Sequence, residues 1–536
     1  MTLTYCKQPL VPLALGLAAG ILAGDGFPSL AGWPGLCVCG TLMFMGWLCR
    51  DRHALAAQCC LLLAVVALGA TLMSLRLRRD KLPLPSQPAT CQAIITDEPL
   101  PRGRTVQADM ELTAINGVPL KHSLRTRGVF LSGSMTKGGH TPHMGDGIEA
   151  YCTITLPEST RWSKRKDRHF DETRWMLAQG YRAVAVIRPY HWNRRALPLS
   201  ALSRYRRMQM RMRLCRQQLL AQYRRNGMKG REYAVVAAMT LGYKTNLQPE
   251  LRQVYAATGT SHVLALSGLH LTIVLSTLLC LLRLTRINRW VAYWLALLAL
   301  WSYVALVGMP VSALRSAVTL TVCTVALLLH RTHASVSALS LAAIVLLTSN
   351  PYSLWDISFQ LSFAAVLSII IGMPIADRVW HPRHWAVLWL WRCACVSVVA
   401  QLGTQPLTLY YFGQASFYFL LSNMLVAALV YVILALSLCF FAATPLPAAQ
   451  QLCATLLALA TRLLNTGLQG IASLPGAQMG AIAFNRTQVA LCYVALLSLA
   501  AAAHRLLNTY FKTDTDKTYW TKKIEQMKPK RTDGEA

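Results

Sequence analysis

The chain has 536 residues, of which 54% are apolar and only 14% are charged, and its 53 Lys and Arg against 22 Asp and Glu give a formal net charge of +31. This composition excludes a single soluble globular domain. Several apolar runs approach the roughly 20 residues that cross about 30 Å of hydrocarbon. The sequence therefore predicts a polytopic α-helical membrane protein, part of whose positive charge lies in cytoplasmic loops.

Residues 1–79 predict three N-terminal transmembrane helices, at about 9–27, 33–49 and 55–74. The first run carries only Lys7 ahead of it and further spans follow, so we expect a retained helix rather than a signal peptide. The turn at 50–52 is basic, which by the positive-inside rule predicts a cytoplasmic N-terminus. The chain would then emerge on the outer side from residue 75 onward.

Residues 80–198 differ, because apolar density falls and turn residues separate short alternating runs. One helix is expected at 170–179, before the last strand. This pattern suits a small closed β-barrel of the OB type, inserted as an extracytoplasmic domain; a two-layer α+β domain is the competing fold. The five expected strands are 91–97, 106–116, 127–134, 147–156 and 181–188.

A basic and aromatic cluster lies in this domain, where residues 75–200 carry 20 Lys and Arg against 11 Asp and Glu. Such a mixture suits single-stranded nucleic acid, because phosphates bind cations and bases stack on aromatic rings at roughly 1–3 kcal/mol each. A solvated loop lying on anionic lipid headgroups is the alternative. This predicted DNA-gathering surface consists of Arg161, Trp162, Lys164, Arg165, Lys166 and Arg168.

Most of the 16 cysteines lie in apolar spans, where they behave as small hydrophobic residues. Cys91 and Cys152 fall instead on the first and fourth predicted strands. If the domain faces an oxidising compartment, a disulfide between them is expected, and two free buried thiols are the alternative. No cysteine pair has zinc-site spacing, so we expect no metal site.

The segment 199–231 is strongly basic, with ten Lys and Arg and no acidic residue between positions 204 and 231. Interleaved apolar residues such as Met208 and Leu220 predict an amphipathic basic helix. A position on the membrane surface is the favoured interpretation. A phosphate-contacting wall of a cavity is the alternative.

Residues 232–506 predict the membrane core, and 507–536 a basic cytoplasmic tail. Starting outside, nine crossings put that tail and the basic turns at 283–289 and 378–383 in the cytoplasm. The run 336–349 is short and also suits a re-entrant segment. The nine expected spans are 262–283, 290–309, 311–330, 336–349, 357–376, 386–411, 416–442, 449–470 and 487–506.

Polar residues interrupt these spans. Arg315 follows a helix-breaking Gly-Met-Pro step at 308–310, and Asp356 and Gln360 lie one turn apart on one face. Polar residues at 401–406, including a proline, are expected to break another helix. Broken helices and buried polar groups are tolerated where they line water-filled cavities, so a polar pathway is favoured over a simply packed bundle.

The stretch 259–274, GTSHVLALSGLHLTIV, places His262, Ser267 and His270 at the head of an apolar helix. Ionisable groups there are costly unless they face protein or water. An intramembrane serine hydrolase could use Ser267 with either histidine, although only His270 shares its helix face well.

The motif HVLALSGLH in this stretch resembles the signature of the ComEC family of competence proteins, the inner-membrane channels for DNA uptake. Tyr243 departs from the resemblance, since the family often has an acidic residue there. The further similar segments occur in the family's order, at 241–244, 249–253, 313–317, 350–363 and 401–423, with 170–180 in the soluble part.

The resemblance implies passage of single-stranded DNA across the cytoplasmic membrane during natural transformation. It implies as partners the DNA, membrane lipid and other competence proteins, namely an external DNA receptor and a cytoplasmic helicase or DNA-binding protein. We expect no cofactor, and the oligomeric state stays open. The residues expected to line or gate the DNA path are His262, Ser267, Gly268, His270, Arg315, Asp356, Gln360, Gln405 and Asn423.

Many members of that family continue into a metallo-β-lactamase-like nuclease domain with an HxHxDH motif. The nearest sequence, at 140–146, lacks that spacing, so we expect no catalytic residues and no nuclease activity in this polypeptide. No GxxxxGK[ST] loop occurs, so the driving force would come from elsewhere. A secondary transporter of a small anionic solute, an intramembrane hydrolase and a membrane scaffold without transport remain as alternatives.

Overall fold

The computed structural model describes residues 9–27, 33–49, 53–80, 84–85, 87–131, 141–157, 171–329, 335–480 and 482–526. The chain divides into two compact units, each described here by itself. The larger unit holds residues 5–360 and 415–479, and the smaller unit holds 1–4, 361–414 and 480–536. The protein is mostly helical and multi-pass, with a small closed β-barrel, as the sequence predicts.

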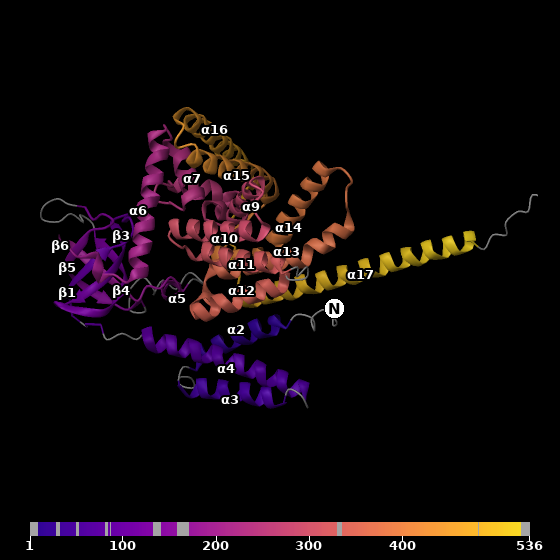
Figure 1. The fold of residues 1–536 in the computed structure, drawn as a ribbon, viewed down its shortest axis with the longest axis horizontal. Coiled ribbons are helices and arrows are strands. Elements are labelled where there is room, and N and C mark those ends of the chain that lie inside the picture. Colours follow the sequence, from indigo (N-terminus) through magenta and orange to yellow (C-terminus); the bar gives the residue numbers. More distant parts are fainter. Residues whose placement is uncertain are drawn as a thin grey trace, which may run out of the picture. The chain divides into compact units, whose positions relative to one another are not determined.

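The inserted domain is a closed barrel in which β1 pairs with both β5 and β3 (Figure 1). The strand order β1-β5-β6-β4-β3 closes through the β1–β3 ladder, and only β4 and β6 run parallel. This closure rules out the two-layer alternative. The elements are β1 (Ala89–Ile95), β2 (Leu100–Arg102), β3 (Thr105–Ile115), β4 (Val118–Leu131), β5 (Gly147–Thr155), α5 (Glu172–Ala178) and β6 (Ala183–Arg194).

The long β3–β4 hairpin turns at Asn116 and Gly117, whose φ values are 49° and 78°. Left-handed backbone at both positions is the requirement of a tight type I′ turn, which Asn-Gly satisfies. β4 therefore begins at Val118, nine residues before the strand expected from position 127. The sequence concealed this part of the strand because its Lys, His and Arg residues break the apolar alternation.

Cys91 and Cys152 lie on the neighbouring strands β1 and β5, and both are buried in the barrel core. Their Sγ atoms are 2.8 Å apart, and both thiols are free in this structure. The hydrogen bond to Cys91 and burial raise the pKa of Cys152. Because the thiolate is the attacking species, uncatalysed oxidation of this pair is expected to be slow.

We predict that these two cysteines form a disulfide in cells, since their sulfur atoms are already adjacent and the domain is expected outside the cytoplasm. Protein from cells quenched in acid and alkylated without reduction should yield one linked peptide pair. Cys215, which is exposed on α6, should be alkylated in the same sample and serves as the control. Recovery of alkylated Cys91 and Cys152 would contradict the predicted disulfide. It would also remove this support for a barrel outside the cytoplasm.

The three N-terminal helices form one bundle, in which α2 and α4 are in unusually close contact. Gly16, Gly20 and Gly24 recur every four residues along α2, and a Cβ at Gly20 would lie 2.0 Å from the Val66 carbonyl oxygen. Small residues at this spacing let membrane helices approach backbone to backbone. The helices are α2 (Leu10–Gly26), α3 (Trp33–Cys49) and α4 (Ala54–Asp80).

Gly20→Ala is therefore expected to destabilise the protein, although alanine normally favours a helix over glycine by roughly 1 kcal/mol. The backbones must separate to admit the methyl group, because the obstructing atom belongs to the Val66 main chain. Gly40→Ala on α3 is the matched control, since a Cβ there meets nothing within 4 Å. Thermal melting in detergent should show a lower midpoint for Gly20→Ala alone; equal midpoints would refute the close-packing argument.

The barrel contacts the helices through ion pairs and hydrogen bonds. Arg174 lies 2.8 Å from Asp25 of α2, and Arg182 lies 3.3 Å from Asp80 at the end of α4. Asn350, which precedes the 3₁₀ turn η5 (Pro351–Trp355), donates to the Ala178 carbonyl at 2.7 Å. The Asn-Pro motif at 350–351 thus has a structural role that the sequence did not reveal.

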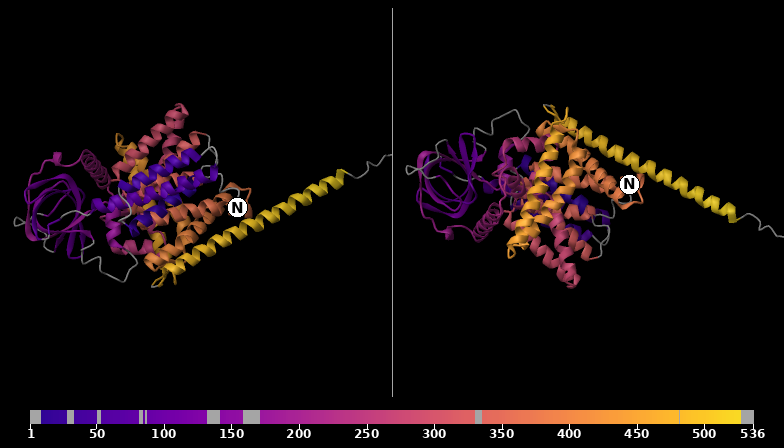
Figure 2. Two further views of the ribbon diagram at one scale, coloured as in Figure 1. Left: turned by 90° about the horizontal axis from the view of Figure 1, so that it is seen from below. Right: turned by 90° about the horizontal axis from the view of Figure 1, so that it is seen from above.

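The basic segment forms α6 (Arg204–Arg225), which runs alongside the barrel (Figures 1 and 2). Arg213 and Arg216 on this helix are buried, and both pair with Asp97 of the barrel, at 3.3 and 3.4 Å. This face therefore cannot bind lipid headgroups, as the membrane-surface interpretation required. Arg206 also pairs at 2.8 Å with Glu111, so three of the ten basic residues of the segment are directed toward the barrel, while six of the other seven are exposed.

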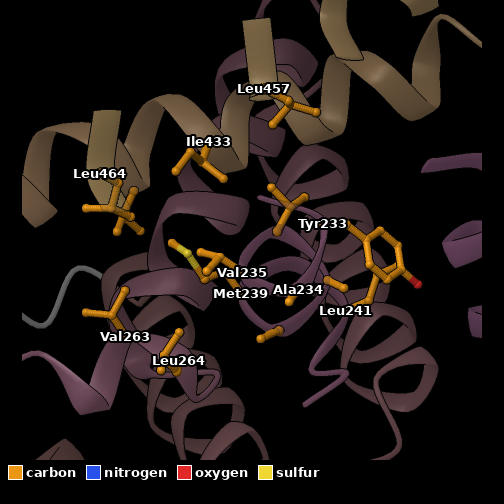
Figure 3. Close-up of a cluster of buried hydrophobic side chains, with 14 of the residues drawn as sticks. Tyr233, Ala234, Val235, Met239, Leu241, Val263, Leu264, Ile433, Leu457 and Leu464 are labelled. Carbon is orange, nitrogen blue, oxygen red and sulfur yellow. The ribbon is translucent and has the colours of Figure 1, made fainter. Parts of the chain in front are cut away.

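The core of the larger unit is built around α7 (Gly230–Leu241), a helix absent from the expected spans (Figure 3). Its residues from Tyr233 to Leu241 are all buried. A helix that is apolar all round belongs in the centre of a bundle. Ile433 of α15 and Leu457 and Leu464 of α16 pack around it, together with Val263.

Seven described helices are long and apolar enough to cross a membrane, and four apolar helices are shorter. Three of the nine spans expected in the core are not among the seven: α9 and α12 are shorter, and α16 is in neither group. The remaining elements are η3 (Leu199–Ala201), α8 (Pro249–Ala257), η4 (Ser261–Leu264), α9 (Gly268–Leu284), α10 (Arg289–Leu306), α11 (Val311–Leu328), α12 (Ser335–Ser349), α13 (Ile357–Val379), α14 (Trp385–Phe412), β7 (Ala415–Ser416), α15 (Phe419–Ala442), α16 (Pro447–Ala472), β8 (Gln478–Met479) and α17 (Arg486–Gln526).

Within the smaller unit, α14 continues through Pro406 without the expected break. Pro406 has no N–H for the Leu402 carbonyl, and beside it the Tyr493 hydroxyl of α17 donates to the Gly403 carbonyl at 2.9 Å. Such compensation is how membrane helices tolerate proline. The polar residues at 401–406 therefore do not mark a break in this helix.

Candidate functional site

The HVLALSGLH stretch forms the turn between α8 and α9. Gly259 has φ of 73°, and a Cβ there would lie 3.1 Å from the Ser416 Cβ. Only glycine combines that backbone conformation with so little space. His262 follows in η4 with its side chain exposed, and α9 starts at Gly268.

Ser267 and His270 form the N-terminal cap of α9. The Ser267 backbone N–H donates to His270 Nδ1 at 3.3 Å, and the Ser267 hydroxyl lies 2.7 Å from the same nitrogen. Because Nδ1 accepts these bonds, a neutral ring carries its proton on Nε2. That Nε2 is buried without a hydrogen-bond partner, and His270 has 0% of its surface exposed.

The Ser267–His270 contact also has the geometry of a nucleophile and a base, so the hydrolase alternative needs a physical test. A base is normally oriented by a third group. Here the nitrogen that such a group would hold, His270 Nε2, has no hydrogen-bond partner in the described part of the chain. A capping box accounts for the pair without catalysis.

The start of α9 lies against α11. A Cβ on Gly268 would come within 3.3 Å of the Ser316 hydroxyl oxygen, so glycine permits the close approach of the two helices. Arg315 is the neighbouring residue of Ser316, one turn into α11. The helix begins there because Gly308 and Met309 adopt left-handed φ values of 97° and 55° before Pro310.

Arg315 is a buried guanidinium with 7% of its surface exposed, and its Nε and Nη1 atoms have no hydrogen-bond partner. Asp356, which has 2% of its surface exposed, lies within electrostatic range. The two do not form an ion pair among the residues described here. Unpaired charges in such a setting are costly and mark sites that need an explanation.

Asp356 caps α13, because its Oδ1 accepts the Ser358 N–H at 2.7 Å. Its other carboxylate oxygen, Oδ2, is buried without a partner. Gln360, one turn later, donates from Nε2 to the Leu354 carbonyl at 2.9 Å and so closes η5. Asp356 and Gln360 therefore both help to hold the η5–α13 turn in place.

The structure brings together some of the expected path residues. Ser267, Gly268 and His270 start α9, and His262 lies within electrostatic range of His270. α11, which carries Arg315, and α15, which carries Asn423, both pack against α9. The Asn423 Oδ1 atom is buried without a hydrogen-bond partner.

Two groups of expected residues are not brought to this site. Gln405 belongs to the smaller unit, where its Oε1 accepts from Gln401 Nε2. The expected DNA-gathering surface, residues 161–168, lies outside the described residues. Among the described residues, no group of three or more His, Cys, Asp or Glu could hold a metal ion.

A family model described as Competence protein matches residues 239–506, which is half of the chain. ComE operon protein 3 of Bacillus subtilis (strain 168) is 37% identical over 191 residues, corresponding to 36% of this chain and 24% of that protein. The matched segment thus covers a minor part of that relative's length. No solved structure matches the chain.

Proposed function

This chain belongs to the competence protein family, and from this premise we propose that it carries single-stranded DNA across the cytoplasmic membrane during natural transformation. The observation that supports this most strongly is the buried Arg315, a permanent cation in a membrane helix with two nitrogens unpaired. Such a group has a reason to be there if an anion passes it.

The physical requirement is severe, because a DNA strand brings one negative charge per nucleotide and burying each charge without compensation would be prohibitive. Sparse cations and hydrogen-bond donors along a hydrated route avoid that cost without holding the strand tightly. Arg315, the Nε2–H group of His270 and the ring N–H of His262 would supply donors, and Asn423 would supply a neutral polar group. Asp356 would prevent Arg315 from binding a phosphate permanently.

The proposed orientation places the barrel outside and both termini in the cytoplasm. The positive-inside rule supports this arrangement through the basic turns at 50–52 and 283–289. The barrel and its residues 161–168 would gather the strand delivered by an external receptor. A cytoplasmic helicase or DNA-binding protein would then supply the driving force.

A deletion strain tests the proposal directly. Labelled DNA should still reach the cell surface, but label protected inside the cytoplasm should fall to background, and the gene supplied in trans should restore it. Equal internal label in the deletion strain and its parent would overturn the proposal.

A secondary transporter of a small anion is the second candidate, since the unpaired Arg315 would also suit one inorganic or organic anion. The two functions separate in proteoliposomes. A small-anion transporter would exchange labelled phosphate or carboxylates without any competence partner, whereas a strand channel would bind an oligonucleotide and show no such exchange.

A further inference from the structure

Four cations from distant parts of the larger unit lie close together where the barrel meets the helices. Arg102 is on β2 and Arg127 on β4, while Lys244 follows α7 and Arg252 is on α8. Arg252 Nη2 donates to the Lys244 carbonyl at 3.0 Å, which fixes these two residues side by side. The Tyr243 hydroxyl donates to Glu98, which holds the barrel turn before β2 against the segment that carries Lys244. Arg102 is within electrostatic range of both Arg127 and Arg252.

Repulsion acts between Arg102 and each of Arg127 and Arg252, and between Lys244 and Arg252. Burial, then Arg127 and Arg252, lower the pKa of Arg102 below its usual value, and burial and Arg252 do the same to the pKa of Lys244. Such arrangements are unfavourable until an anion enters. Because Arg102 and Arg252 are exposed, an anion from solution can reach them.

The cluster lacks the neutralisation that the chain provides elsewhere. Each buried arginine of α6 in contact with the barrel has a carboxylate within 4 Å. In the described ranges, none of the four cations has a carboxylate within 4 Å; Glu172 acts on Arg102 at longer range, and Glu98 is bonded to Tyr243.

Arg127 is held in position before any ligand arrives. Its guanidinium lies 5.1 Å from the ring centres of both Trp175 and Tyr181. Tyr181 is fixed in turn, because its hydroxyl donates to Asp109 at 2.5 Å and Asp109 pairs with Arg125 at 2.9 Å. A guanidinium whose face is stacked still presents its N–H groups at the edge, which suits phosphate oxygens.

We propose that Arg102, Arg127, Lys244 and Arg252 form a binding site for the phosphates of single-stranded DNA, where the strand leaves the barrel and enters the helical part of the larger unit. The inference rests on the proposed transport function and gives it a location. α8 leads from this site to η4 and His262, so the four-cation site would precede the path residues.

The test uses the full chain in nanodiscs of zwitterionic lipid, with a fluorescein-labelled 20-nucleotide oligo(dT) as the probe. Anisotropy titrations at several salt concentrations compare the wild type with Arg102→Ala/Arg252→Ala. The control is Arg283→Ala/Arg289→Ala, which removes the same charge from exposed positions at the end of α9 and the start of α10. We expect at least tenfold weaker binding in the first double variant alone, and a salt slope lower by about 0.7 per lost phosphate contact.

Arg102→Glu distinguishes a ligand site from a packing contact. Among the described residues the Arg102 side chain has no hydrogen bond to lose, and the new carboxylate can pair with Arg252, so the melting temperature should stay the same or rise while oligonucleotide binding is lost. A lower melting temperature for Arg102→Glu would show that the cations hold the fold and would overturn the inference.

The remaining outcomes are also decisive. If the wild type binds and both double variants bind equally, the inference fails while the proposed function stands. If the wild type binds no oligonucleotide, both fail together. If the difference between the variants vanishes in nanodiscs containing phosphatidylglycerol, the site belongs to lipid phosphates, which likewise overturns the inference.

Discussion

Arg315→Met is expected to lower transformation by about 10- to 150-fold while the protein still reaches the membrane. Methionine keeps much of the side-chain volume and removes the charge. A hydrogen bond to a charged group is worth roughly 1.5–3 kcal/mol, which converts to that range if one such bond assists the rate-limiting passage of a phosphate. The measurement is transformant frequency at saturating DNA, normalised to the amount of protein in the membrane fraction.

The same substitution should not destabilise the fold. Arg315 is buried with two nitrogens unpaired, and replacing a poorly compensated buried charge by an apolar group is often neutral or stabilising. A path residue thus predicts lost transport with an unchanged or higher melting temperature. A structural residue predicts the opposite pair of results.

Arg315→Lys and His262→Ala extend this test. Lysine keeps the charge and should retain more transport than methionine, although it lacks the planar fork of arginine. His262→Ala removes an exposed donor near His270 and should also lower transformation. Unchanged transformation in both Arg315→Met and His262→Ala would mean that these residues only pack the helices.

The apolar spans and the barrel could be predicted because their signals are local. A run of about 20 apolar residues or an alternating strand carries its own evidence in consecutive positions. The central helix α7 was missed because it has only 12 residues and is covered by α15 and α16, which follow it by some 200 positions. Periodicity alone does not distinguish such a short apolar run in a helix from a buried strand.

The pairing of α6 arginines with carboxylates of the barrel was not predictable either. Ten basic residues with no acid among them indicate a surface that seeks external anions. For Arg213 and Arg216 the anion is internal, because both pair with Asp97, which lies more than 100 residues before them. The contacts of the expected path residues were not predictable from the sequence either, since Gln360 bonds to a backbone carbonyl.

Asp97→Ala is expected to lower the free energy of unfolding by about 3 kcal/mol, at the lower end of the range for breaking a buried ion pair. Asp97 compensates two guanidinium groups, but 32% of its own side chain is exposed, so water replaces part of the loss. Chemical denaturation in detergent measures the change. Glu149→Ala is the matched control, because the Glu149–Arg195 pair is exposed and such pairs contribute roughly 0–1 kcal/mol.

A triple variant separates the effect of charge from the effect of packing at the contact between Asp97 of the barrel and α6. In Asp97→Ala/Arg213→Met/Arg216→Met the unpaired buried cations are gone, so much of the lost stability should return. The cost that remains measures two further contacts, from Arg213 to the Thr96 carbonyl at 2.6 Å and from Arg216 to the Val307 carbonyl at 2.9 Å. No recovery would show that Asp97 acts through packing rather than charge.

The contact between the barrel and α6 also affects transport. Arg216 bonds to the Val307 carbonyl, and Val307 directly precedes the Gly308-Met309-Pro310 step, after which α11 and Arg315 follow. Asp97→Ala is therefore expected to lose both stability and transformation, whereas Arg315→Met loses transformation alone. In the triple variant, stability should recover further than transformation, since Arg216 no longer positions the start of α11. Parallel recovery of both would mean that the barrel and the Arg315 site are mechanically independent.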